Sequence, residues 1–209
     1  MKNILLIGDS IRMGYDKAVK KTLDGIANVY YPEENCRFAA YVLRYLHEYK
    51  ELLNGEELDV LHWNAGLWDC LRLFEEEPHT PIEIYRYYIE RICVHVKKLF
   101  PKAEVIFATS TSVLQDEMSP EFKRYNKEIE EYNRVAAEVV SKHGFAVNDL
   151  YSVAVSLPAE AHSDAVHYYT PIGTEAFANK VLLQLSDVLG LEKVPEYKEA
   201  LYTDKPIGK

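Results

Sequence analysis

The stretch that decides the fold is NILLIGDSIRMGYDKAVKKTL, residues 3–23. It opens with a continuous apolar run that stops at Gly8-Asp9-Ser10, and it then continues with apolar residues at helical spacing. A short apolar run of this kind suits a strand that is covered on both faces, whereas the following spacing suits an amphipathic helix. The stretch therefore predicts a strand, a tight turn and a helix, with a serine where the strand ends.

The same alternation continues along the chain. Further apolar, β-branched runs predict strands at residues 27–32, 58–63, 103–110 and 144–149. Helical periodicity predicts helices at residues 11–24, 37–54, 81–100, 120–143 and 171–189. Strands that alternate with helices build a parallel sheet with helices on both faces. We therefore expect an α/β fold of three layers, α/β/α, around a five-stranded parallel sheet.

Three Ser/Thr-Pro pairs mark expected helix N-termini, because a hydroxyl can cap a helix and proline is favoured at its first position. They are Thr80-Pro81, Ser119-Pro120 and Thr170-Pro171. Glu83 adds a capping-box acid to the first of them. Lys142-His143 followed by Gly144 is typical of a helix C-terminus.

Composition limits the range of functions. The 209 residues are 48% hydrophobic and carry a net charge of −9. This supplies one hydrophobic core and is a poor match to nucleic acid or an anionic membrane surface. We expect one domain over residues 1–190. Residues 191–209 lose periodicity and gain proline and charge, so we expect a tail that packs on the surface or is partly disordered.

The three cysteines, Cys36, Cys70 and Cys93, are widely spaced and fall in no CxxC pattern. This spacing argues against a disulfide framework and against a structural zinc site. The apolar run near the N-terminus is too short for a signal-peptide core or a membrane span. We therefore expect a cytoplasmic protein with no membrane span, and we leave open a homodimer formed by exposed helix faces.

Ser10 is the first candidate for chemistry. Ligands of open parallel sheets bind beyond the carboxyl ends of the strands, and Ser10 directly follows the first strand. The free N–H groups of the next helix could stabilise negative charge that develops there. The structural alternative is that Ser10 caps the helix and that Asp9 complements the helix dipole.

A serine nucleophile needs a base, and the base needs a carboxylate to orient it. Asp164 and His167 lie three residues apart in a polar loop just before the last predicted helix. At that separation on a turn, the carboxylate can accept a hydrogen bond from the imidazole. A solvated loop is the alternative, and the sequence offers no convincing further ligands for a metal site.

With these residues in place, the chain resembles the SGNH or GDSL hydrolases, a family of esterases and acylhydrolases with a flavodoxin-like α/β/α fold. The resemblance rests on Gly8-Asp9-Ser10 and on Asp164-Ala165-Val166-His167, and the layout matches over residues 1–189. It implies that Ser10 is the nucleophile, that His167 is the general base and then acid, and that Asp164 orients His167. It also implies an oxyanion hole that includes the Ser10 backbone N–H. The α/β-hydrolase alternative lacks its GxSxG elbow.

The chain departs from the family pattern at two places. After the second strand the family has a glycine whose N–H joins the oxyanion hole, and Cys36 occupies that place here. After the third strand the family has Gly-x-Asn-Asp, whereas Gly66 and Asp69 flank a tryptophan, Trp68, where asparagine is usual. Asn64 could substitute, the Trp68 indole could donate, or the hole could have fewer donors. We favour Asn64, because a buried amide is costly unless it is paired or functional.

The resemblance implies a serine esterase that needs no metal and no organic cofactor. We expect a small-molecule ester as the substrate, with a short acyl group on a polar, carbohydrate-like alcohol. Two alternatives stay open: a thioesterase or lysophospholipase that uses the same triad, and a non-catalytic flavodoxin-like binding module. Trp68 in place of asparagine keeps the second alternative in view.

Overall fold

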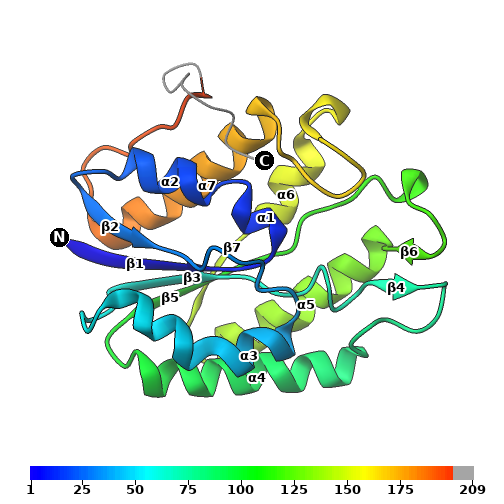
Figure 1. Cartoon of the computed structure of the whole chain (residues 1–209), viewed down its shortest axis with the longest axis horizontal. Coiled ribbons are helices and arrows are strands. Elements are labelled where there is room, and N and C mark those ends of the chain that lie inside the picture. The colour runs from blue at the N-terminus through cyan, green and yellow to red at the C-terminus, as the bar shows by residue number, and fades with distance from the viewer. Residues whose placement is uncertain (200–209) are drawn as a thin grey trace.

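The computed structural model describes residues 1–199 and is a three-layer α/β/α sandwich (Figure 1). Its central sheet has five parallel strands in the order β2-β1-β3-β5-β7. The strands span Lys2–Ile7 (β1), Ala27–Tyr30 (β2), Val60–Trp63 (β3), Glu104–Ala108 (β5) and Ala146–Asn148 (β7). This is the flavodoxin-like order, with the reversal of strand order beside β1. The predicted fold class is confirmed.

Helices cover both faces of the sheet. On one face lie α1 (Ser10–Met13), α2 (Asp16–Thr22), α6 (Leu150–Ser156) and α7 (Pro171–Leu189), and on the other lie α3 (Ala39–Tyr49), α4 (Ile82–Leu99) and α5 (Asn126–Lys142) (Figure 1). Short 3₁₀ turns occur at Lys50–Leu53, Gln115–Glu117 and Ala159–Ala161. Among residues 1–199, none of the helices combines the length and apolar character needed to cross a membrane.

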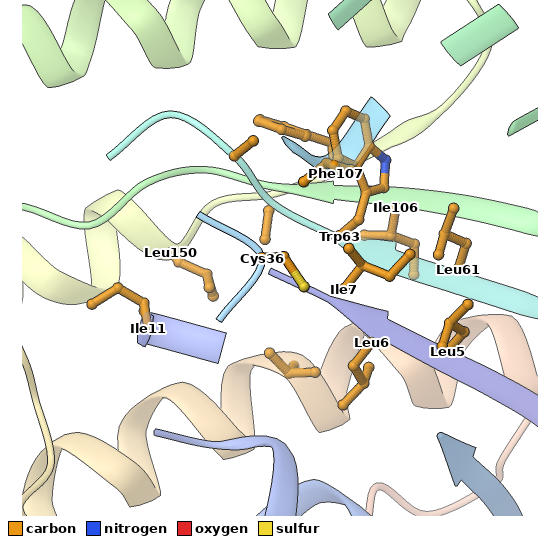
Figure 2. Packing of buried hydrophobic residues seen from close by; sticks show 14 of the residues in the cluster. Leu5, Leu6, Ile7, Ile11, Cys36, Leu61, Trp63, Ile106, Phe107 and Leu150 are labelled. Atoms are coloured by element: carbon orange, nitrogen blue, oxygen red, sulfur yellow. The ribbon is translucent and has the colours of Figure 1, made fainter. Parts of the chain in front are cut away.

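The core is centred on β1, whose four residues from Ile4 to Ile7 are completely buried. Trp63 on β3 and Phe107 on β5 pack edge to face with ring centroids 5.0 Å apart. Figure 2 shows these two rings on one side of the sheet and Leu6 on the other. Aromatic pairs of this geometry contribute about 1 kcal/mol beyond their buried area. Burial on both faces explains why the strands read as continuous apolar runs rather than as alternating ones.

Two helix boundaries differ from the sequence prediction. The helix predicted at 11–24 is interrupted at Gly14 and Tyr15, so α1 is one short turn and α2 starts at Asp16. The helix predicted at 120–143 begins only at Asn126. The intervening residues Phe122–Lys123 form a short strand, β6, which pairs antiparallel with β4 (Arg72–Leu73) beyond the carboxyl ends of the sheet (Figure 1).

The predicted caps have mixed outcomes. Thr170 caps α7 as expected, because its Oγ1 accepts a hydrogen bond of 3.1 Å from the Gly173 N–H. The Lys142-His143-Gly144 ending of α5 is also confirmed. The Thr80 capping box is wrong, since α4 starts after Pro81 without a side-chain cap and Thr80 Oγ1 lies 3.2 Å from His79 Nδ1. Ser119-Pro120 precedes β6 and caps no helix.

The first part of the expected tail, residues 191–199, lies against α7. Asn179 holds both backbone groups of Tyr197, accepting from its N–H at 2.7 Å and donating to its carbonyl at 3.0 Å. Tyr197 is completely buried. Residues 200–209 of the same expected tail are outside the described residues.

Asp69 caps α3 from a different part of the chain. Phe38, the residue before α3, offers no side-chain cap, and the Ala39 N–H instead donates to the Asp69 carboxylate at 3.0 and 3.2 Å. Asp69 is completely buried, and burial raises the pKa of its carboxyl to about 7 despite these hydrogen bonds. The carboxyl therefore ties the start of α3 to the loop after β3 at an electrostatic cost.

Replacing Asp69 by asparagine tests that cost. Between pH ~4, where aspartate ionises in an unfolded chain, and the raised pKa, the folded state holds a proton that the unfolded state has lost. The free energy of unfolding therefore falls as pH rises through this window. Urea unfolding at pH 5 and at pH 8 measures this decrease in the free energy of unfolding. The decrease should be smaller in Asp69→Asn than in the wild type, by roughly 2–3 kcal/mol. Equal losses in the two proteins would contradict the assignment.

Candidate active site

The turn after β1 places Ser10 at the start of α1. Asp9 is the N-cap of this helix, and its Oδ1 accepts a hydrogen bond of 2.9 Å from the Ile11 N–H. The structural alternative, in which Ser10 itself caps the helix, is therefore not what the structure contains. Burial raises the pKa of Asp9, and the Ile11 N–H, the Asn64 side chain and the charge of Arg124 oppose that rise.

Ser10, His167 and Asp164 form a continuous hydrogen-bonded chain. Ser10 Oγ lies 2.8 Å from His167 Nε2, although the two residues are 157 positions apart in sequence. His167 Nδ1 lies 2.8 and 3.0 Å from the two carboxylate oxygens of Asp164. A proton on Nδ1 that is shared with Asp164 leaves Nε2 free to accept the serine hydroxyl. The three residues predicted from sequence are thus brought together at hydrogen-bond distances.

The loop that carries Asp164 and His167 is held by its own backbone. Asp164 Oδ1 accepts the N–H groups of Val166 and His167, each at 2.8 Å, and the Ser163 N–H donates to the His167 carbonyl at 2.8 Å. Partial burial disfavours the charged form of Asp164, but these hydrogen bonds outweigh it and lower the pKa of the carboxyl. Asp164 therefore carries a negative charge beside the imidazole at neutral pH.

Tyr169 is a site residue that the sequence analysis missed. Its hydroxyl donates to the Ser10 carbonyl at 2.5 Å, and its ring stacks on His167 with centroids 4.8 Å apart and 26° between the planes. Gly14 permits this close approach, because a Cβ there would lie 2.9 Å from the Tyr169 ring. One side chain thus contacts both the serine and the histidine. The sequence feature that could have identified Tyr169 is its position two residues after His167, together with a side chain that combines an apolar ring with a polar hydroxyl.

Asn64 lies on the buried side of the Gly8-Asp9-Ser10 turn. Its side chain is beside the Asp9 carboxyl, and a Cβ built on Gly8 would come within 1.9 Å of its Oδ1. Asn64 is 4% exposed, and its Oδ1 has no hydrogen-bond partner within the described residues. The structure therefore places this amide against the turn that carries the serine.

Cys36 does not supply a free donor. Its backbone N–H donates to the Gly8 carbonyl at 3.1 Å, and its side chain is completely buried. This corrects the expectation that Cys36 contributes to an oxyanion hole, because an N–H group already bound within the protein is not available to a ligand. Burial also raises the pKa of the Cys36 thiol. By contrast, the Ser10 N–H is the first of its helix and has no acceptor inside it.

The remaining predicted residues lie in the loop after β3. Gly66 is buried, and a Cβ there would lie 2.7 Å from Ser110 Oγ and 3.2 Å from the Tyr85 hydroxyl. Trp68 is half-buried and lies edge-on to Phe122 at 6.4 Å between ring centroids, so it joins the loop to β6. Trp63, by comparison, belongs to the core.

Arg124 is a second residue that the sequence analysis missed. It is 2% exposed, its Nε donates to the Leu67 carbonyl at 2.5 Å, and its guanidinium lies 4.9 Å from the centre of the Phe122 ring. Its positive charge lowers the pKa of Asp9. Arg124 thus fixes the loop after β3 and offsets the buried negative charge beside Ser10. The sequence pattern placed it inside an exposed helix, which concealed this contact.

No protein-family model matches the sequence, and no curated protein matches it by sequence either. Solved structures do match. A lipase/acylhydrolase from Enterococcus faecalis superposes with a TM-score of 0.70 at 20% identity, over 93% of this chain and 98% of that chain. The chain has the fold of this lipase/acylhydrolase.

Two further solved structures share this GDSL-type fold. A GDSL-like lipase from Bacteroides thetaiotaomicron gives a TM-score of 0.68 at 15% identity, over 91% of this chain and 89% of that chain. An acetylxylan esterase from Geobacillus stearothermophilus gives 0.65 at 15% identity, over 91% and 95% of the two chains. The GDSL-type fold therefore extends over nearly the whole described chain.

The described part of the chain holds no cluster of three or more His, Cys, Asp or Glu side chains arranged to bind a metal ion. All three cysteines are buried and unpaired.

Substituting Gly8 by alanine tests the fit of the turn. The added methyl group would lie 1.9 Å from Asn64 Oδ1 and 2.8 Å from Arg12 Cβ. Gly8→Ala should lower the free energy of unfolding by about 2–3 kcal/mol, measured by urea titration. In the double variant Gly8→Ala/Asn64→Ala part of this loss should return, because the nearest obstructing atom is gone. Strict additivity of the two substitutions would show that the contact does not exist.

Proposed function

We propose that the protein is a serine-dependent carboxylic ester hydrolase of the SGNH or GDSL family. The observation that carries the proposal is the hydrogen-bonded chain from Ser10 through His167 to Asp164, with 2.8 Å at each of its two closest contacts. These three residues lie at the carboxyl edge of a parallel sheet, where ligands of open α/β folds bind. The GDSL-type fold shared with lipases, acylhydrolases and an acetylxylan esterase supports the same conclusion.

The proposed reaction proceeds through an acyl-enzyme. Ser10 Oγ attacks the acyl carbonyl while His167 Nε2 takes the hydroxyl proton, and the resulting imidazolium is stabilised by Asp164. The tetrahedral intermediate collapses as His167 gives the proton to the leaving alcohol. A water molecule then enters, loses a proton to His167 and attacks the acyl group. Release of the carboxylic acid returns the proton to Ser10.

The Ser10 N–H is the first proposed donor to the oxyanion, since it is free at the N-terminus of α1 and close to the reacting oxygen. We propose the Asn64 amide as the second donor, because it lies against the turn that carries Ser10. Tyr169 is a proposed positioning residue, since it contacts both Ser10 and His167.

The proposed substrate is an ester of a short acyl group with a polar, carbohydrate-like alcohol. One structural neighbour is named as an acetylxylan esterase, whose substrate is of this type. Thioesters and lysophospholipids would use the same triad, so a substrate panel that includes them decides the acyl donor.

The first test is hydrolysis of p-nitrophenyl acetate by the purified protein. Wild type should turn over, while Ser10→Ala and His167→Ala should lose activity by about 10³-fold or more, because each removes a member of a unit that acts together. Asp164→Asn should also lose activity, since the amide can no longer stabilise the imidazolium. Circular dichroism of each variant controls for folding.

An organophosphonate that reacts with activated serines provides an independent readout. Mass spectrometry should find one adduct, on Ser10, in the wild type and none in Ser10→Ala. Background-level hydrolysis in all proteins together with an unlabelled Ser10 would refute the esterase proposal and favour a non-catalytic binding module.

The second oxyanion donor can be identified by comparing two substitutions. Asn64→Ala should lower kcat by about 10²-fold, the usual effect of losing one oxyanion donor, with little change in KM. Trp68→Phe keeps an aromatic ring and removes only the indole N–H, so it should change kcat less than threefold. The reverse order would assign the donor to Trp68, and unchanged kcat in both would leave Ser10 as the sole protein donor among these groups.

A further inference from the structure

A cavity of about 230 Å³ lies between the α1–α2 segment and the loop that follows β2. Tyr169 is part of its wall, and the same tyrosine contacts both Ser10 and His167. Arg12, also in the wall, lies two residues after Ser10 on α1. Tyr169 and the start of α1 therefore connect the wall of the cavity to Ser10.

A buried ion pair forms the inner wall of the cavity. Arg12 and Asp16 are 1% and 2% exposed and are directly hydrogen-bonded, and Arg12 Nη2 also donates to the Glu34 carbonyl at 2.6 Å. Arg12 Nε and Asp16 Oδ1 nevertheless have no partner within the described residues. Unpaired buried polar atoms are rare and costly, so their presence beside a cavity points to a polar ligand.

The remaining walls combine aromatic rings with charged side chains. Tyr31 and Tyr169 contribute rings, Glu33 contributes an exposed carboxylate, and Lys17 contributes an exposed cation. Because Arg12 is paired with Asp16, the four charges balance, and the lining favours a neutral ligand over a net anion or cation. Carboxylate oxygens accept hydroxyl hydrogens, and tyrosine rings pack against C–H surfaces. These are the two kinds of surface that a sugar ring presents.

We propose that this cavity is the subsite for the alcohol part of the substrate, and that it takes a neutral, hydroxyl-rich group the size of one sugar ring. The inference rests on the proposed esterase function and adds the location and chemistry of the leaving-group site. The cavity has the volume of roughly eight liquid water molecules, which is sufficient for a single ring. Asp16, Tyr31 and Glu33 are its specificity-determining residues.

Two acetate esters of different size test the proposal. The alcohol of methyl acetate is too small to reach the cavity, whereas that of a mono-O-acetylated methyl β-xylopyranoside fills it. The measured quantity is the ratio of kcat/KM for the xyloside to kcat/KM for methyl acetate. Glu33→Gln and Tyr31→Ala should each lower this ratio about tenfold, the usual value of one charged hydrogen bond or one aromatic contact.

Glu51→Gln is the matched control, because Glu51 is also an exposed carboxylate, lies in the 3₁₀ turn after α3 and is outside the cavity wall. It should leave the ratio unchanged. A ratio that is unchanged in Glu33→Gln and Tyr31→Ala as well would overturn the subsite.

Binding of the free methyl β-xylopyranoside to Ser10→Ala separates the two proposals. If wild type hydrolyses neither ester, the esterase proposal fails, and the binding measurement alone then decides the cavity. Shifts of Tyr31 and Tyr169 ring resonances in NMR titrations that weaken in Glu33→Gln support the sugar subsite. No shift at millimolar xyloside overturns it.

Discussion

The complete burial of Ile4 to Ile7 of β1, between β2 and β3, determines where the other parts of the site can lie. Because both faces and both edges of this strand are covered, the chain must leave it in a turn that fits beneath Asn64 and beside Arg12. Glycine at position 8 meets that requirement, and Asp9 then starts α1 with the serine at its first position. Ser10 is therefore oriented by the packing of the core around β1.

Three buried carboxyl groups, Asp9, Asp16 and Asp69, lie near the carboxyl edge of the sheet. Burial raises the pKa of Asp9, and it raises the pKa values of Asp16 and Asp69 to about 6 and about 7. Two buried arginines, Arg12 and Arg124, are the compensating cations. Each acid also holds the start of a helix or an arginine in place. Burying these ionisable groups costs free energy, and their hydrogen bonds fix the geometry of the loops near the site.

Local patterns predicted the fold and the three residues of the hydrogen-bonded chain because each depends on features that are close in sequence. Continuous apolar runs marked the strands, Thr170 marked α7, and Asp164 lies three residues from His167. The resemblance to a known family supplied the pairing of this loop with Ser10. That contact spans 157 positions, and spacing alone would not have revealed it.

Contacts made by backbone atoms or by long side chains across the fold were not predictable in this way. The Cys36 N–H is engaged by the Gly8 carbonyl, a fact that depends on how the loop after β2 closes. Arg12 and Arg124 fall within segments predicted as helices, and each reaches a carbonyl of a distant loop and is buried. Whether a charge is buried depends on what packs over it, which periodicity does not encode.

The short loop that carries Asp164 and His167 has one more consequence. Asp164 and His167 lie within four residues of each other and are joined by hydrogen bonds inside the loop, so their mutual geometry is set locally. Hydrogen bonds of His167 and Tyr169 with Ser10 join this loop to α1. In the proposed esterase, the loop therefore behaves as a module that can be lengthened or re-angled to admit bulkier substrates while the imidazole keeps its own carboxylate.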